Sequence, residues 1–248
     1  MLLTAYPLSV GLISAGSADG NSEPILPRTA RGVFLLGGVE LVIFGVVFAM
    51  AWLASRASAE ELCLKWRDGL WPLLRGFGYS IALRIFIGIV AAAAILVARA
   101  LFGAGEAELK QAMPRVEAMV DAKALTQDPL YFCLMLTFVS FVVAGLREEL
   151  WRAGMLAGLQ ALFPKHFRNK AGGLVAVTII AVAFGLGHLP QGWSGVAVTT
   201  LLGIGLGGII VLHRSIWDAV LAHGFFDATT FVMLYLIARF FPDVSPAG

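Results

Sequence analysis

The chain has 248 residues, of which 59% are hydrophobic and only 14% charged, and its formal net charge is +2. A soluble domain carries about 25% charged residues, so this composition excludes an ordinary soluble protein and indicates a membrane protein. The small net charge also gives no reason to expect nucleic acid as a partner.

Apolar runs separated by short polar segments divide the chain from end to end. Because a membrane-spanning helix needs about 20 apolar residues, we predict an all-α fold, a polytopic transmembrane helix bundle of about six spans. The predicted spans are 32–54, 77–102, 129–162, 171–189, 196–212 and 216–238. Residues 1–31 and 241–248 are predicted to be tails, and residues 32–128 to form two N-terminal spans and a polar loop.

The third run starts at Asp128-Pro129, where an aspartate cap is followed by a proline at the first helical position. A helix from there to Leu162 would measure roughly 50 Å, more than the hydrocarbon thickness of about 30 Å. We therefore expect it either to protrude or to break near Gly145 or Gly154.

This same run contains the most informative motif of the chain, the string Arg-Glu-Glu-Leu-Trp-Arg at 147–152. No charged residue occurs between 129 and 146 or between 153 and 163. Ionised side chains at membrane depth are costly and usually face a bundle interior or a watery cavity. Arg152 lies four residues after Glu148 and three after Glu149, so it can pair with one glutamate while the other stays free to titrate.

Three other carboxylates of the N-terminal half are not predicted to belong to a site. Glu60 and Glu61 repeat the Glu-Glu-Leu string, but they have basic neighbours and no flanking apolar run, as on a solvated surface. Glu40 is a single carboxylate in the first span and is left out of the predicted site.

Two later spans add polar groups at a similar depth. If the helices on either side of the basic turn 163–170 form a hairpin, Glu148 and His188 lie roughly 22 and 27 Å from it. On the last span, His223 and Asp227 share one helix face, roughly 12 and 18 Å from the same side. Two histidines, two glutamates and an aspartate from three helices are therefore expected to meet inside the bundle.

This ordered set resembles the CPBP family of membrane-embedded proteases, which includes the type II CAAX prenyl endopeptidases and the bacterial abortive-infection and bacteriocin-immunity proteins. The resemblance rests on Glu148-Glu149…Arg152, on Phe184-x-x-x-His188 and on a final histidine and aspartate, and it covers 129–240. Two positions depart from the family pattern. Two residues rather than three separate the glutamate pair from the arginine, and the last motif ends in aspartate where the family often has asparagine.

The resemblance implies an intramembrane endopeptidase that hydrolyses a peptide bond of a membrane-associated or lipidated substrate with a glutamate-activated water. Glu148 would be the general base and His188 would position the water. His223 and Asp227 would line the oxyanion position, with Asp227 orienting His223. Glu149 and Arg152 complete the predicted catalytic set. The resemblance also implies a multi-pass protein of the bacterial inner membrane.

Three alternatives stay open at this point. Two histidines and a glutamate could hold a zinc ion, although no His-Glu-x-x-His string occurs and we commit to no cofactor. The shifted Arg152 is compatible with a catalytically inactive scaffold or immunity protein of the same fold. A proton-coupled transporter would also explain buried glutamate, histidine and aspartate, but not their order.

A glycine string at 203–208 satisfies the Gly-x-Gly-x-x-Gly pattern of dinucleotide sites. That motif requires a preceding strand, whereas this one lies inside an apolar span. The spacing of Gly203 and Gly207 instead predicts close packing between membrane helices.

Overall fold

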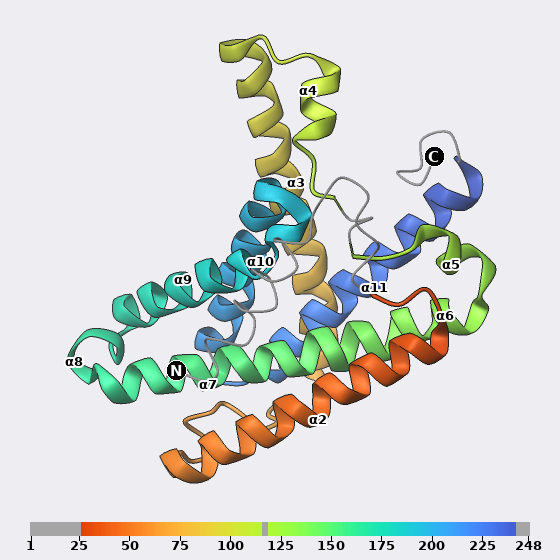
Figure 1. The fold of residues 1–248 in the computed structure, drawn as a ribbon. Helices are drawn as coiled ribbons and strands as arrows, with labels where there is room; N and C mark the ends of the chain where they lie inside the picture. The colour runs from red at the N-terminus through yellow and green to blue at the C-terminus, as the bar shows by residue number, and fades with distance from the viewer. Residues whose placement is uncertain (1–25, 116–118, 242–248) are drawn as a thin grey trace.

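Figure 1 shows the computed structural model, which describes residues 26–115 and 119–241, and every element in this part of the chain is a helix. The predicted all-α polytopic bundle is therefore confirmed. Five helices are long and apolar enough to cross a membrane: α2 (Ala30–Ser55), α3 (Trp71–Phe102), the continuous helix Pro129–Leu162, the segment Leu189–His213 and α11 (Trp217–Phe240). The sixth predicted span is α9 (Lys170–Leu186), which is apolar but has only 17 residues.

Short helices occupy the connections between these spans. They are α4 (Glu106–Gln111), α5 (Ala122–Gln127) and α8 (Pro164–Phe167). Most of the predicted tails, 1–25 and 242–248, lies outside the described residues.

The helix Pro129–Leu162 is continuous and does not break at either predicted glycine. It consists of α6 (Pro129–Leu134), the π-helical segment η2 (Met135–Leu146) and α7 (Arg147–Leu162). The Asp128 carboxylate caps its start by accepting hydrogen bonds from two backbone N–H groups, as the sequence predicted. Inside η2, the Ser140 hydroxyl donates to the carbonyl of Met135, five residues back, at 2.7 Å. A π-helical stretch is rare and often marks a functional segment.

Helix α2 runs alongside this long helix, as Figure 1 shows. A Cβ added to Gly37 of α2 would lie 2.7 Å from the Phe138 ring, so the missing side chain lets the two helices meet. Phe34 contributes a second contact, with its ring centroid 5.4 Å from that of Phe138. Helix α2 thus reaches the long helix at the level of η2.

Helices α9 and α10 (Gly192–His213) pack tightly side by side, joined by the 3-10 turn η3 (Leu189–Gln191). A Cβ at Gly203 would lie 3.1 Å from the Cβ of Ala181, and one at Gly207 would lie 2.6 Å from Val177. The glycine string therefore serves helix packing, as predicted, and follows no strand.

Helix α11 crosses the long helix at η2 and also packs against α3. A Cβ added to Gly145 would lie 2.9 Å from the carbonyl oxygen of Val220 and 3.0 Å from that of Ser140. On the other side of the contact, a Cβ at Gly224 would overlap the Phe141 ring. This close approach places the last helix directly beside the start of α7.

We predict that Gly145→Ala destabilises the protein because backbone atoms of α11 and of η2 leave no room for a methyl group. Overpacking of this kind costs about 1–3 kcal/mol. Gly158→Ala is the matched control, since it lies in the same long helix with nothing within 4 Å of the added Cβ. Helix propensity favours that change by about 0.5–1 kcal/mol. Thermal unfolding in detergent should give a lower midpoint for Gly145→Ala alone, and equal midpoints would contradict the close contact.

Candidate active site

The two glutamates of the predicted motif stand in the first turn of α7, directly after η2. They differ sharply in their surroundings. The side chain of Glu149 is 0% exposed, whereas that of Glu148 is 16% exposed. Neighbours in sequence therefore occupy two environments, one sealed and one partly open.

Glu149 forms a buried ion pair with Arg152, whose side chain is 2% exposed. Nη1 of the arginine donates to Oε1 of the glutamate, and the guanidinium carbon lies 4.0 Å from the centroid of the Phe184 ring of α9. The pair thus joins α7 to α9. The arginine neutralises the buried carboxylate by reaching back three residues along the helix.

The same Oε1 atom of Glu149 lies 2.9 Å from Nδ1 of His223 on α11. A carboxylate can only accept, so Nδ1–H of the histidine donates and the tautomer follows from this bond. The other ring nitrogen, Nε2, lies 3.6 Å from Oδ2 of Asp227 and 3.8 Å from Oε2 of Glu148. Glu149 therefore orients His223 through Nδ1, whereas Asp227 is the residue predicted to do so. Asp227, 25% exposed, faces the opposite nitrogen.

Glu148 is bound on its other oxygen by Arg147, with Nη2 of the arginine 3.2 Å from Oε1. Its carboxylate is thus contacted by one cation and faces His223. The carboxylates of Glu148 and Asp227 thus both lie within 4 Å of Nε2 of His223, so these three predicted residues are neighbours.

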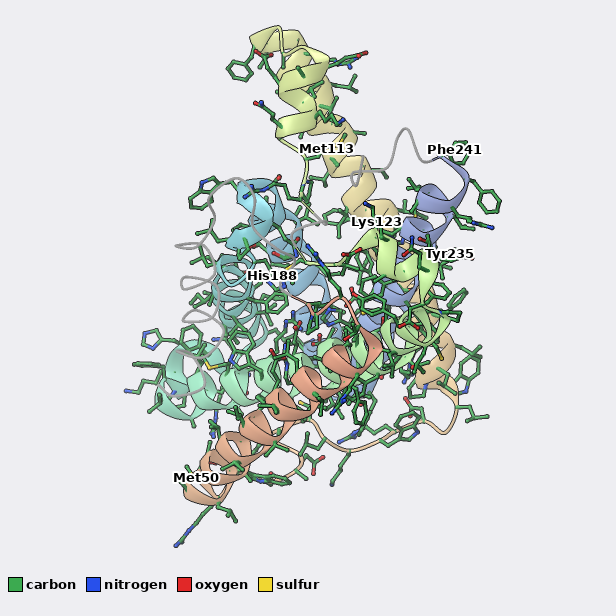
Figure 2. All side chains as sticks on the ribbon, turned by 45° about the vertical axis from the view of Figure 1, so that its right-hand side comes forward. Met50, Met113, Lys123, His188, Tyr235 and Phe241 are labelled. Atoms are coloured by element: carbon green, nitrogen blue, oxygen red, sulfur yellow. The ribbon has the colours of Figure 1, made fainter. Side chains whose placement is uncertain are left out.

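His188 lies in the turn between α9 and α10 and is labelled in Figure 2. The span predicted to reach Leu189 ends at Leu186, because a helix usually ends at or before the residue preceding a proline, here Pro190. Nδ1–H of His188 donates to the carbonyl of Phe184 at 3.0 Å, which leaves Nε2 as the acceptor of the neutral ring. His188 and Glu148 lie close enough for their charges to interact.

Sequence reasoning missed two partners of this cluster that come from the N-terminal helices. Glu40 of α2 accepts a hydrogen bond from Arg147 at 2.6 Å. Arg84 of α3 donates to the Phe226 carbonyl and to the hydroxyls of Thr229 and Thr230, on both sides of Asp227 in α11. Glu40 and Arg84 are each a single charged residue in an apolar span, and this feature could have identified both from the sequence.

The contrasting glutamates of the N-terminal half are exposed as predicted. Glu60 pairs with Lys65 and Arg67, and these hydrogen bonds lower the pKa of its carboxyl below its ordinary value. The side chain of Glu60 remains 48% exposed. Glu60 therefore lies on the surface, in contrast to the buried Glu149 of the other Glu-Glu-Leu string.

Each histidine of the cluster uses its two ring nitrogens differently. Both histidines commit Nδ1 to protein acceptors, and Nε2 of His223 faces two carboxylates at 3.6 and 3.8 Å. Over residues 26–115 and 119–241, no group of three or more His, Cys, Asp or Glu side chains is placed to hold a metal ion.

We predict that Arg152→Met strongly destabilises the protein, because it leaves the Glu149 carboxylate buried without its cation. Breaking a buried pair by removing one partner costs about 3–5 kcal/mol. Replacing both partners, as Glu149→Gln with Arg152→Met, should recover part of the loss in thermal unfolding. Lys65→Met, which breaks the exposed pair with Glu60, should leave the midpoint unchanged. A midpoint for Arg152→Met equal to that control would contradict the buried-pair assignment.

Comparison with protein families matches residues 129–229 to the family described as type II CAAX prenyl endopeptidase Rce1-like. The matched segment begins with α6, ends within α11 and contains all six predicted site residues, while Glu40 and Arg84 lie outside it. Curated proteins and solved structures give no match. The resemblance to the CPBP proteases is thereby confirmed over residues 129–229, the segment that is similar to the type II CAAX prenyl endopeptidase Rce1-like family.

Proposed function

We propose that this protein is an intramembrane endopeptidase in which Glu148 is the general base that activates water. The observation that carries the proposal is the contrast between the paired glutamates. Glu149 is sealed and neutralised by Arg152, while Glu148 stays partly open beside His223 and Asp227. The Glu149 carboxylate would therefore have a structural role, and the Glu148 carboxylate would be the one that accepts a proton.

In this mechanism the Glu148 carboxylate takes a proton from water as the water oxygen bonds to the carbonyl carbon of the substrate. His188 offers Nε2 as an acceptor for the second hydrogen of that water, since its Nδ1–H is bound to Phe184. The protonated Glu148 then gives its proton to the leaving amine as the C–N bond breaks. General-base catalysis of this kind contributes about 10²–10⁴-fold to rate.

His223, with Asp227, would stabilise the negative charge that develops on the carbonyl oxygen of the substrate. With Nδ1–H bound to Glu149, the ring can donate from Nε2 only when it carries both protons. Asp227, on the same side of the ring, then acts as its counter-charge. Removing one oxyanion donor typically lowers kcat by about 10²–10³-fold.

The substrate we propose is a membrane-associated or lipidated polypeptide. The matched family is described as a type II CAAX prenyl endopeptidase, and in a CAAX motif the prenyl lipid is attached to a cysteine near the carboxyl terminus. The apolar helices around the site would accommodate such a lipid, and the bilayer is the medium through which it arrives.

The central test is Glu148→Gln, which keeps the size of the side chain and removes the base. We expect cells carrying the native chain to contain new membrane-protein or secreted termini that vanish with Glu148→Gln at equal protein level. In nanodiscs, cleavage of a farnesylated CAAX peptide should fall by about 10²-fold or more. Glu60→Gln, on the exposed surface, is the matched control and should cleave like the native chain.

Unchanged termini with Glu148→Gln would refute the protease assignment. Together with a phenotype that depends on the protein, they would favour the inactive scaffold. Proton flux into liposomes containing the native chain would instead favour the transporter.

A glutamate-activated water needs no metal, so we predict that a strong zinc chelator leaves the rate of peptide cleavage unchanged. The measurement compares initial rates before and after dialysis against the chelator, with zinc added back in a third sample. Loss of activity that zinc restores would assign the reaction to a metal-activated water instead.

A further inference from the structure

Helix α2 brings one carboxylate to the candidate active site from outside the family-matched segment. Nη1 of Arg147 donates to Oε2 of Glu40 at 2.6 Å, and Nη2 of the same guanidinium contacts Oε1 of Glu148 at 3.2 Å. A single cation is thus shared between the proposed base and a carboxylate that no family motif includes.

The shorter of the two contacts belongs to Glu40, so the guanidinium is drawn away from Glu148. Opposite charges at this separation attract each other, and the attraction is stronger where water is excluded. Without Glu40, Arg147 would have Glu148 as its nearest carboxylate among these three residues. It would then close onto the base, favour its ionised form and hold the oxygen that must accept the proton.

We propose that Glu40 is a positioning residue for catalysis: by sharing Arg147 it limits the contact of this arginine with Glu148 to one oxygen, Oε1 at 3.2 Å, and leaves Oε2 of Glu148 to accept a proton from water. The inference rests on the proposed function only in naming Glu148 as the base. It adds a residue of the N-terminal half to the machinery of the reaction.

Anchoring α2 would be the simpler role for this ion pair, but apolar contacts already do that. Gly37 and Phe34 hold α2 against Phe138 close to the same level. Partly buried ion pairs contribute little net stability, because desolvation offsets their attraction. The other titratable or charged groups that interact with Glu148 are His188, His223, Asp227 and Arg152, and none of them lies on α2.

The experiment measures the reactivity of Glu148 directly, in the full-length protein in nanodiscs. Dicyclohexylcarbodiimide, an apolar reagent, adds a protonated carboxyl group across one of its C=N bonds, and mass spectrometry locates the adduct. We expect Glu40→Gln to slow labelling of Glu148 by about fivefold, because Arg147 then favours the ionised carboxylate. Glu40→Asp should restore part of the native rate, and Glu40→Gln with Arg147→Gln should label at least as fast as the native chain.

Catalysis supplies the second readout. With the farnesylated CAAX peptide, Glu40→Gln should lower kcat about fivefold while KM stays within twofold of native, since the substrate keeps its contacts. Glu60→Gln is the matched carboxylate control for both readouts and should change neither.

Equal labelling of Glu148 in the native chain and in Glu40→Gln, including no labelling in either, would overturn the inference. A labelling difference combined with full cleavage activity of Glu148→Gln would separate the two ideas. In that case the link between Glu40, Arg147 and Glu148 stands, while the proposed base is wrong.

Discussion

The buried ion pair between Arg152 and Glu149 is the interaction on which the rest of the site depends. One oxygen of Glu149 accepts from both Arg152 of α7 and His223 of α11, and the guanidinium covers Phe184 of α9. Three helices are therefore fixed around one carboxylate. Without Glu149, the histidine ring that faces the second glutamate would lose the hydrogen bond at Nδ1.

The pair is not fully satisfied by the protein. Among the described residues, no hydrogen-bond partner is found for Oε2 of Glu149 or for Nε and Nη2 of Arg152. Each buried polar atom without a partner costs free energy. A hydrophobic pair of the same volume would often be as stable or more stable. Such a cost is typical of a functional site, where geometry takes precedence over stability.

Much of this arrangement could be predicted from the sequence because membrane helices leave few choices. Long apolar runs fix the spans, and a charge inside such a run must be paired or functional, which singles out Glu148, Glu149 and Arg152. Helical spacing placed both glutamates within reach of Arg152 and predicted that it can pair with one of them. The structure gives that partner as Glu149.

What could not be predicted depends on contacts between distant segments. Which residue orients His223 is decided by how α11 crosses the long helix at η2, and the spacing of residues within one helix does not predict that crossing. The pairing of Glu40 with Arg147 joins positions 107 residues apart. Pro190 indicated that α9 ends before His188. The predicted span was nevertheless extended to Leu189, because the apolar run continues to that residue.

The π-helical segment η2 has a consequence for how this protein can change during evolution. It spans twelve residues immediately before the glutamate pair and carries the glycine that lets α11 approach. Deleting one residue there would rotate the following helix by roughly 100° about its axis relative to α11. Glu148 and Glu149 would then turn away from His223 together. Insertions and deletions can accumulate in the polar connections. The length of η2, in contrast, is constrained because it sets the direction in which Glu148 and Glu149 point.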